Sequence, residues 1–175
     1  MTAAPVLDPQ RTALILVDLM ERIVALPLEP RKGSEVLATA EELAATFRAA
    51  AAPVVLVRVE RPSTAEQPSG SGLVPGLAAE GDLEVVKRTI GAFQGTGLDE
   101  RLRERGVTTL VFGGIATNLG VESTARAAAD LGYDLVFAED AMAAFTAAEH
   151  EASVRLDFPR LGTVVTAAGI RLAAA

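Results

Sequence analysis

The sequence predicts an open, mostly parallel α/β sheet with helices on both faces. Short, nearly all-apolar runs rich in β-branched residues recur along the chain, as in strands that are covered on both faces. Segments with helical spacing of apolar residues separate several of these runs. Strands and helices therefore alternate almost throughout. At 175 residues, half of them apolar, the chain is expected to form a single domain, residues 1–175.

The first predicted unit consists of a strand, a helix and a second strand. Its strands are residues 12–19 (TALILVDL) and 52–60 (APVVLVRVE), both short and dominated by apolar side chains. Residues 34–51 between them show helical spacing behind a candidate N-cap at Ser34. The apolar side chains on one face of this helix are Val36, Ala40, Leu43 and Phe47. We therefore expect a βαβ unit here.

A second unit of the same kind follows later in the chain. Residues 109–114 (TLVFGG) and 133–140 (YDLVFAED) repeat the strand pattern. Residues 118–132 between them are predicted to be a helix that ends at Gly132. Residues 163–166 (TVVT) supply a last strand.

Two shorter helices are predicted from their N-terminal capping patterns. Thr96 precedes Asp99, and Thr146 precedes Glu149, so each hydroxyl stands three residues before a carboxylate. Such a pair can satisfy the free N–H groups of a first helical turn. We expect one helix to begin after each threonine.

One connection, residues 61–82, breaks the alternation of strands and helices. It is rich in Pro, Gly and Ser, and a stretch this long without regular structure is usually functional or mobile in a compact domain. Two interpretations stay open. The segment is either a lid over a site or a surface excursion with a small entropic cost.

The charge and hydropathy of the chain limit its partners. The formal net charge is −7 and the isoelectric point is near 4.8, with basic residues scattered rather than clustered, so nucleic acid is not an expected partner. The longest uncharged apolar runs fall far short of the roughly 20 residues that a membrane span requires. Residues 1–11 show no apolar core of a signal peptide. We therefore expect a soluble, cytoplasmic protein that does not bind membranes.

The chain contains no cysteine and a single histidine, His150. This is expected to exclude disulfides, thiolate zinc sites, and both cysteine-based and ordinary Ser-His-Asp catalysis. His150 follows the capping pattern of a predicted surface helix, where a solitary histidine is expected to be solvated. Catalysis is therefore expected to depend on carboxylates, amines, hydroxyls or the main chain, with no cofactor and no metal.

Asp18 is the strongest candidate for acid or base chemistry. It ends the first apolar strand, at the edge where open α/β sheets bind ligands, and partial burial should raise the pKa of its carboxyl. A solvated turn or helix-cap aspartate is the alternative. Lys87 ends the short apolar segment 83–86 and is either a surface lysine or a partner of Asp18 that neutralises charge developing on a substrate. Arg88 is expected to face the opposite side and to be structural.

The glycine-rich turn GGIATNLG (113–120) is a second candidate site. Gly113, Gly114, Ala116 and Gly120 carry little side-chain bulk, so we expect a ligand to approach the main chain closely there. The turn does not match the dinucleotide fingerprint G-x-G-x-x-G, which disfavours an NAD enzyme. Ser123 lies one helical turn beyond Gly120, but no G-x-S-x-G elbow surrounds it, so packing or hydrogen bonding is its expected role.

Three blocks of the sequence, in this order, resemble the isochorismatase-like hydrolases. They are ALILVDL (13–19), VVKRTIGAFQGTGLDERLRERGV (85–107) and LVFGGIATNLGVESTARAAADLGYDLVFAEDAMA (110–143). The resemblance spans roughly residues 12–166. It implies a Rossmann-like parallel sheet of about six strands and assembly into homodimers or homotetramers with sites near the subunit interfaces.

The resemblance also implies a set of site residues. Amidase members of the family use an Asp, a Lys and a Cys; Asp18 and Lys87 match the first two positions, and Gly120 stands where the nucleophilic cysteine would be. The family's non-proline cis peptide is expected around Ile115 and Ala116, where it helps to aim an oxyanion hole. The residues assigned to substrate binding are Ile115, Ala116, Thr117, Asn118 and Phe93.

These residues lead to two main hypotheses for function and to a third possibility, an ordinary hydrolase that uses Ser123 and forms a covalent adduct at that residue. The first is a cofactor-independent hydrolase of a small molecule, acting on a vinyl ether or a C–N bond with Asp18 as acid or base and without a covalent intermediate, because Gly120 has no attacking atom. The second is a catalytically silent member that binds a small molecule or serves as an oligomeric partner. Met20 favours the second hypothesis, since the family commonly has glutamine there.

Overall fold

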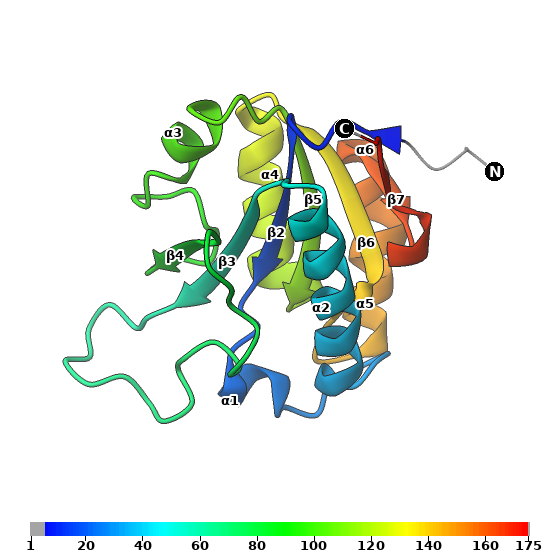
Figure 1. Cartoon of the computed structure of the whole chain (residues 1–175). Coiled ribbons are helices and arrows are strands. Elements are labelled where there is room, and N and C mark those ends of the chain that lie inside the picture. Colours follow the sequence, from blue (N-terminus) through cyan, green and yellow to red (C-terminus); the bar gives the residue numbers. More distant parts are fainter. Residues whose placement is uncertain (1–5, 175) are drawn as a thin grey trace.

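The computed structural model describes residues 6–174, and its centre is a twisted six-stranded sheet (Figure 1). Every pair of neighbouring strands in it is parallel. In spatial order the strands are β4 (Leu83–Lys87), β3 (Val54–Val59), β2 (Thr12–Val17), β5 (Thr109–Ile115), β6 (Asp134–Ala143) and β7 (Thr163–Val165). The predicted α/β class and the Rossmann-like sheet are confirmed. Residues 1–5 and 175 lie outside the described residues. Both belong to the predicted domain, and residues 1–5 also belong to the segment 1–11, for which no signal peptide is expected.

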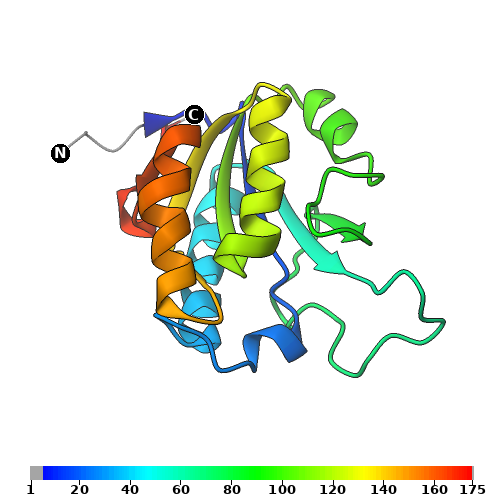
Figure 2. The same cartoon turned by 180° about the vertical axis from the view of Figure 1, so that it is seen from behind.

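Helices cover both faces of the sheet, as predicted. Helix α2 (Gly33–Ala49) crosses one face (Figure 1), and its buried side chains Val36, Ala40, Leu43 and Phe47 are those expected from the spacing. The opposite face, seen in Figure 2, carries the later helices of the chain. They are α3 (Leu98–Arg103), α4 (Glu122–Asp130), α5 (Ala147–Ala152) and α6 (Phe158–Leu161). Two apolar cores therefore enclose the sheet, one on each face.

Smaller elements complete the chain. Strands β1 (Val6–Leu7) and β8 (Arg171–Leu172) form a separate parallel pair. The remaining short helices are α1 (Glu21–Val24), the π-helical turns η1 (Thr117–Val121) and η2 (Ser153–Asp157), and the 3₁₀ turn η3 (Ala167–Gly169). Within residues 6–174, the structure contains no helix whose length and apolar character would allow it to cross a membrane.

The connections of β2 and β5 leave the sheet on opposite faces. These strands are neighbours, but β2 continues into α2 on one face and β5 into α4 on the other. A crevice forms at the carboxyl ends of the strands where such a reversal occurs, and open α/β folds bind their ligands there. The fold thus brings the residues after Val17 and Ile115 to the ligand-binding edge of the sheet.

Glycines let β2 and β5 approach each other at this edge. Gly114 has a φ of 122°, a conformation that favours glycine, and a Cβ there would collide with the main chain of Val17. A Cβ at Gly113 would lie 3.2 Å from side-chain atoms of Leu16 and Ala141. The expectation that a ligand uses the space at Gly113 and Gly114 is therefore wrong, because the neighbouring strands fill it.

Two predicted helix starts also need correction. Helix α2 begins at Gly33 after Lys32, whose N–H donates to Glu35 at 2.7 Å, so Ser34 is the second residue of the helix and not its cap. Helix α3 begins at Leu98, whose N–H donates to Thr96 at 3.3 Å, but Asp99 accepts a hydrogen bond from the Tyr133 hydroxyl, so the predicted capping box of Thr96 and Asp99 is wrong. The threonine-capped start of α5 is confirmed by the Glu149 N–H, which donates to Thr146.

Candidate active site

Asp18 follows the last residue of β2 and turns sharply out of the sheet. Its φ is 52°, in the left-handed region that aspartate tolerates better than most residues, and its N–H donates to the carbonyl of Val57 at 2.8 Å. The side chain is 9% exposed. Burial raises the pKa of the carboxyl above its ordinary value, against the opposing effect of the positive charges of Lys87 and Arg22.

Lys87, the last residue of β4, reaches Asp18 across the end of β3. Its Nζ lies 2.9 Å from Oδ2 of Asp18, and the lysine side chain is 3% exposed. The ammonium also donates to the carbonyls of Ile90, at 2.7 Å, and Thr89, at 3.4 Å. The other carboxylate oxygen of Asp18, Oδ1, is buried without a hydrogen-bond partner among residues 6–174. One oxygen is thus paired, and the other is buried without a partner among the described residues.

Gly120, in the π-helical turn η1, lies directly beside this pair. A Cβ built on it would be 3.2 Å from Oδ2 of Asp18 and 3.5 Å from Nζ of Lys87. It would also be 3.0 Å from a methyl group of Val17, so a side chain here requires Val17 to shift by a few tenths of an ångström. The structure therefore brings the three residues of the predicted constellation together.

A pocket of about 360 Å³ opens over these residues. The cis peptide between Ile115 and Ala116 lies in its wall, as the resemblance implied, and both residues contact the cavity. Much of the remaining wall is apolar. Its apolar lining includes Ile23, Val59, Pro62, Ile90, Ile115, Ala116, Leu119 and Phe145. The cavity can hold a small molecule with an apolar body and a polar group beside Asp18.

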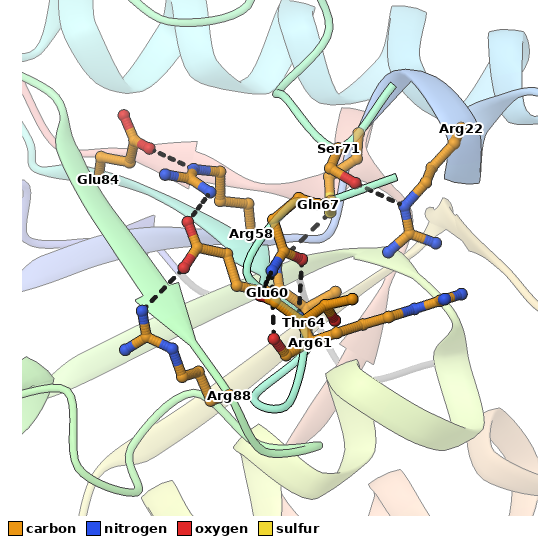
Figure 3. A network of polar contacts seen from close by, with 11 residues as sticks. Arg22, Arg58, Glu60, Arg61, Thr64, Gln67, Ser71, Glu84 and Arg88 are labelled. Carbon is orange, nitrogen blue, oxygen red and sulfur yellow. Dashed lines mark hydrogen bonds and ion pairs between the residues drawn. The ribbon is translucent and has the colours of Figure 1, made fainter. Parts of the chain in front are cut away.

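Charged side chains from β3 and β4 form the outer part of the pocket. In Figure 3, Arg58 and Arg88 both point to the carboxylate of Glu60, at 2.8 and 2.9 Å, and Arg58 also pairs with Glu84 at 2.6 Å. Glu60, Arg61 and Arg88 line the cavity. Arg88 is exposed and ion-paired, and it lines the same cavity as Lys87, so the expectation that it faces the opposite side is wrong.

The segment 61–82 begins at this pocket and then packs beside the start of α1. Its residues Ser71 and Gln67 hold it in shape: Ser71 accepts a hydrogen bond from Arg22, and Gln67 bonds the main chain of Arg61 (Figure 3). Met20 is fully buried beside the same segment. It stands at the position where the resemblance implies a glutamine. Both interpretations of the segment, as a lid and as a surface excursion, remain predictions.

Three residues assigned to substrate binding lie elsewhere. Phe93 lines a separate hollow beside α4 and contacts the ring of Tyr133. Thr117 is fully buried, and its hydroxyl lies 2.8 Å from Nδ1 of His150. Asn118 faces Glu149, 3.5 Å away. None of the three is among the residues that line the pocket over Asp18.

His150 is buried, so its predicted solvation is wrong. Its residue exposure is 3%, because α5 packs against the η1 turn and turns the imidazole inward to Thr117. Burial, reinforced by the positive charge of Arg31, lowers the pKa of the imidazole to about 4. His150 therefore stays neutral near pH 7 and supports the turn that carries Gly120.

The other candidates for chemistry are separate from the pocket. Ser123 lines the same hollow as Phe93, and its side chain packs against Gly91. In residues 6–174 there is no cluster of three or more His, Asp or Glu side chains arranged to hold a metal ion.

Sequence reasoning missed several lining residues, although a signal for some of them was present. Glu60 and Arg61 follow β3, and Phe145 follows β6, so these residues lie at the carboxyl ends of strands where ligands bind. No comparable signal marks Ile23 or Leu119, whose places depend on α1 and η1.

Comparison with known proteins agrees with this arrangement. The family model "Isochorismatase domain" matches residues 12–169. The chain belongs to the isochorismatase family of hydrolases. It is 41% identical to the isochorismatase family protein YecD of Escherichia coli O157:H7, over 90% of this chain and 93% of that protein.

Other relatives within the isochorismatase family cover the chain to different extents. The structure of an isochorismatase family protein from Burkholderia thailandensis superposes with a TM-score of 0.83 and 38% identity, over 95% of this chain and 96% of that one. The ureidoacrylate amidohydrolase RutB of Methylobacterium radiotolerans is 56% identical, but over only 31% of this chain and 21% of its own length. The whole-length matches carry the family assignment.

Proposed function

We propose that this isochorismatase-family chain hydrolyses a small molecule in the pocket over Asp18, without a cofactor and without a covalent intermediate. The observation that carries the proposal is the buried carboxylate of Asp18, with Oδ2 paired to Lys87 and Oδ1 without a partner among residues 6–174. Because burial raises the pKa of this carboxyl above its ordinary value, the group is better suited to exchange a proton with substrate or water than an exposed aspartate.

Two reactions can use this carboxyl group, first as a proton donor in one and first as a proton acceptor in the other. With a vinyl ether, protonated Asp18 gives its proton to the alkene carbon, and water adds to the resulting cation. The carboxylate then takes a proton from that water. The adduct finally splits into a carbonyl compound and an alcohol. With a C–N bond, ionised Asp18 takes a proton from the attacking water and passes it to the leaving nitrogen. Both sequences return Asp18 to its starting state.

Lys87 supports either reaction through its charge. The ammonium is fixed by Asp18 and by two carbonyls, so it cannot turn freely toward a substrate as a base. It stabilises ionised Asp18 and negative charge that develops on a substrate oxygen nearby. Its proposed role is therefore electrostatic orientation.

Gly120 supports a route without a covalent intermediate at position 120. Glycine has no atom that can attack a carbonyl, and no cysteine occurs anywhere in the sequence. Ser123 lines another hollow, together with Gly91, and is not among the residues that line the pocket over Asp18. The attacking group in this proposal is therefore water.

The test is turnover of a vinyl ether, isochorismate, and of an amide-type substrate, ureidoacrylate, with product identified by mass spectrometry. The second substrate is included because the partial relative RutB is a ureidoacrylate amidohydrolase. Asp18→Asn should lower kcat/KM by a factor of about 10² to 10⁴. Glu60→Gln, which changes another carboxylate in the pocket wall, is the matched control and should lower it far less.

The pH profile separates the two reactions. Since the pKa of Asp18 is raised above 3.8, kcat/KM of an acid-catalysed reaction falls as the pH rises through that raised value, and kcat/KM of a base-catalysed reaction falls as the pH decreases through it. Full activity of Asp18→Asn contradicts the proposal. Tight binding of a metabolite without turnover by either protein would instead support the catalytically silent alternative.

We also propose that the chain acts in the cytoplasm as a homodimer or homotetramer. Apolar side chains at the pocket are exposed in the single chain, namely Ile90 (61%), Leu119 (43%) and Phe145 (46%). Burial of such side chains against a second copy favours association. Sedimentation velocity checks the assembly, and a monomer at all concentrations would oppose it.

A further inference from the structure

The hydroxyl of Thr124 joins two segments of the candidate site that are distant in sequence. Thr124 lies in α4 and is fully buried. Its Oγ1 donates to the carbonyl of Gly120 at 2.6 Å and accepts the N–H of Ala92 at 3.0 Å. A threonine in a helix often bonds the carbonyl four residues back, but the bond to Ala92 ties that helix to a segment 32 residues away.

The segment that contains Ala92 also holds the ammonium of Lys87. Two of the hydrogen-bond partners of this ammonium are the carbonyls of Thr89 and Ile90, and the third is Asp18. An ammonium has three N–H donors, so each partner can take one. The position of Nζ therefore depends on where residues 89 and 90 lie.

A close packing contact reinforces this connection. A Cβ on Gly91 would lie 2.9 Å from the hydroxyl oxygen of Ser123 and 3.3 Å from its main chain. Ser123 directly precedes Thr124, so residues 91 and 92 rest on two consecutive positions of α4. The two contacts fix the segment against the helix that begins just after Gly120.

We propose that Thr124 is a positioning residue that sets the distance between the Lys87 ammonium and position 120. It acts through Ala92 on one side and through Gly120 on the other, and it does not touch the pocket. This inference rests on the proposed function, which makes the pocket over Asp18 an active site. Its test does not require turnover.

The experiment uses a single thiol as a probe of the local charge. Gly120→Cys introduces the only cysteine of the chain, with its Cβ expected about 3.5 Å from Nζ of Lys87. A nearby ammonium lowers the pKa of a thiol, and the rate of alkylation by iodoacetamide as a function of pH measures that pKa. Adding Lys87→Met should raise the pKa of the introduced thiol by about 1 or more.

Thr124 is then changed in both backgrounds. With Thr124→Val, which removes the hydroxyl at similar volume, the effect of Lys87→Met on the thiol pKa should fall to less than half. With Thr124→Ser, which keeps the hydroxyl, the effect should be retained. An equal effect of Lys87→Met with Thr124→Val and with the native threonine overturns the proposal.

A second variant tests the same contact without altering Thr124. Gly91→Ala pushes the segment away from Ser123, so it should also reduce the effect of Lys87→Met on the thiol pKa. If circular dichroism shows that Thr124→Val does not fold, the Gly91→Ala result decides whether the positioning role holds. An unchanged effect with folded Gly91→Ala then counts against the proposal. If the chain hydrolyses neither test substrate, the thiol measurement still supports or refutes the positioning role.

Discussion

Two ion pairs in the pocket have the same length and different surroundings. Lys87 and Asp18 lie 2.9 Å apart, with side chains 3% and 9% exposed. Arg88 and Glu60 also lie 2.9 Å apart, but Arg88 is 63% exposed and Glu60 is 21% exposed. The first pair lies at the inner end of the pocket and the second on its wall near solvent.

The difference shows that the length of an ion pair does not determine its energetic role. Water screens the outer pair, so its formation changes stability little. Water cannot reach the inner pair freely, and removal of one partner leaves an uncompensated charge in a medium of low polarity. The same desolvation raises the pKa of Asp18, which is the property the proposed chemistry requires.

The largest expected effect comes from breaking the inner pair. Lys87→Met should lower the free energy of unfolding by about 3 to 5 kcal/mol at pH 8, where Asp18 is ionised without a partner. Burial already raises the pKa of Asp18, and the loss of Lys87 removes the charge and the hydrogen bond that lower it, so protonation of the carboxyl should relieve the cost as the pH falls and the loss should be smaller at pH 5 than at pH 8. Urea unfolding at the two pH values measures the difference.

The double variant Lys87→Met with Asp18→Asn is the control for this prediction. Without the carboxylate, the pH dependence of the difference from the native protein should largely disappear. A loss of stability for Lys87→Met that is equal at both pH values would show that the buried charge of Asp18 is not its cause.

An intermediate effect is expected from His150, a buried group without an ion-pair partner in the part of the chain that the structure describes. Its pKa is about 4 in the folded chain and about 6.5 when unfolded, so the unfolded state binds the proton first. Stability should therefore fall by up to about 3 kcal/mol as the pH decreases from 6.5 to 4. His150→Asn, measured by urea unfolding over this range, should lack that component.

In this measurement, the other titrating groups contribute to both proteins and cancel in the difference between them. A constant difference between native protein and His150→Asn from pH 7 to 4 would contradict burial of a neutral imidazole.

The smallest effect is expected from the outer pair. Arg88→Ala should leave the midpoint of thermal unfolding unchanged within error, because Arg88 is solvated and Arg58 still pairs with Glu60. Differential scanning calorimetry at low and at high salt makes the measurement. A marked, salt-independent loss would mean that the two ion pairs are more alike than their exposure indicates.

Much of the fold follows from patterns that are local in sequence. The apolar runs of β2, β3, β5 and β6 need cover on both faces, and this requirement alone indicates a parallel sheet with helices on each side. Asp18 was found by the same reasoning, since it ends the first of these runs.

The rest depends on packing between distant segments. Lys87 and Asp18 stand on strands separated by β3, and a strand order cannot be read from local patterns, so their meeting was implied by the family resemblance. The capping pattern before His150 predicts where α5 begins. It does not show which face of α5 packs on η1. Phe93 is near Lys87 in sequence, yet it turns to Tyr133 on the other side of its segment.

The left-handed backbone of Asp18 limits how this pocket can change. Most L-residues with a Cβ are unfavourable at a φ of 52°, whereas aspartate, asparagine and glycine are accepted there more readily. Aspartate suits this bend and the longer glutamate does not, so Asp18→Glu would distort the main chain at this position. The bend therefore limits which residues can replace the proposed proton donor.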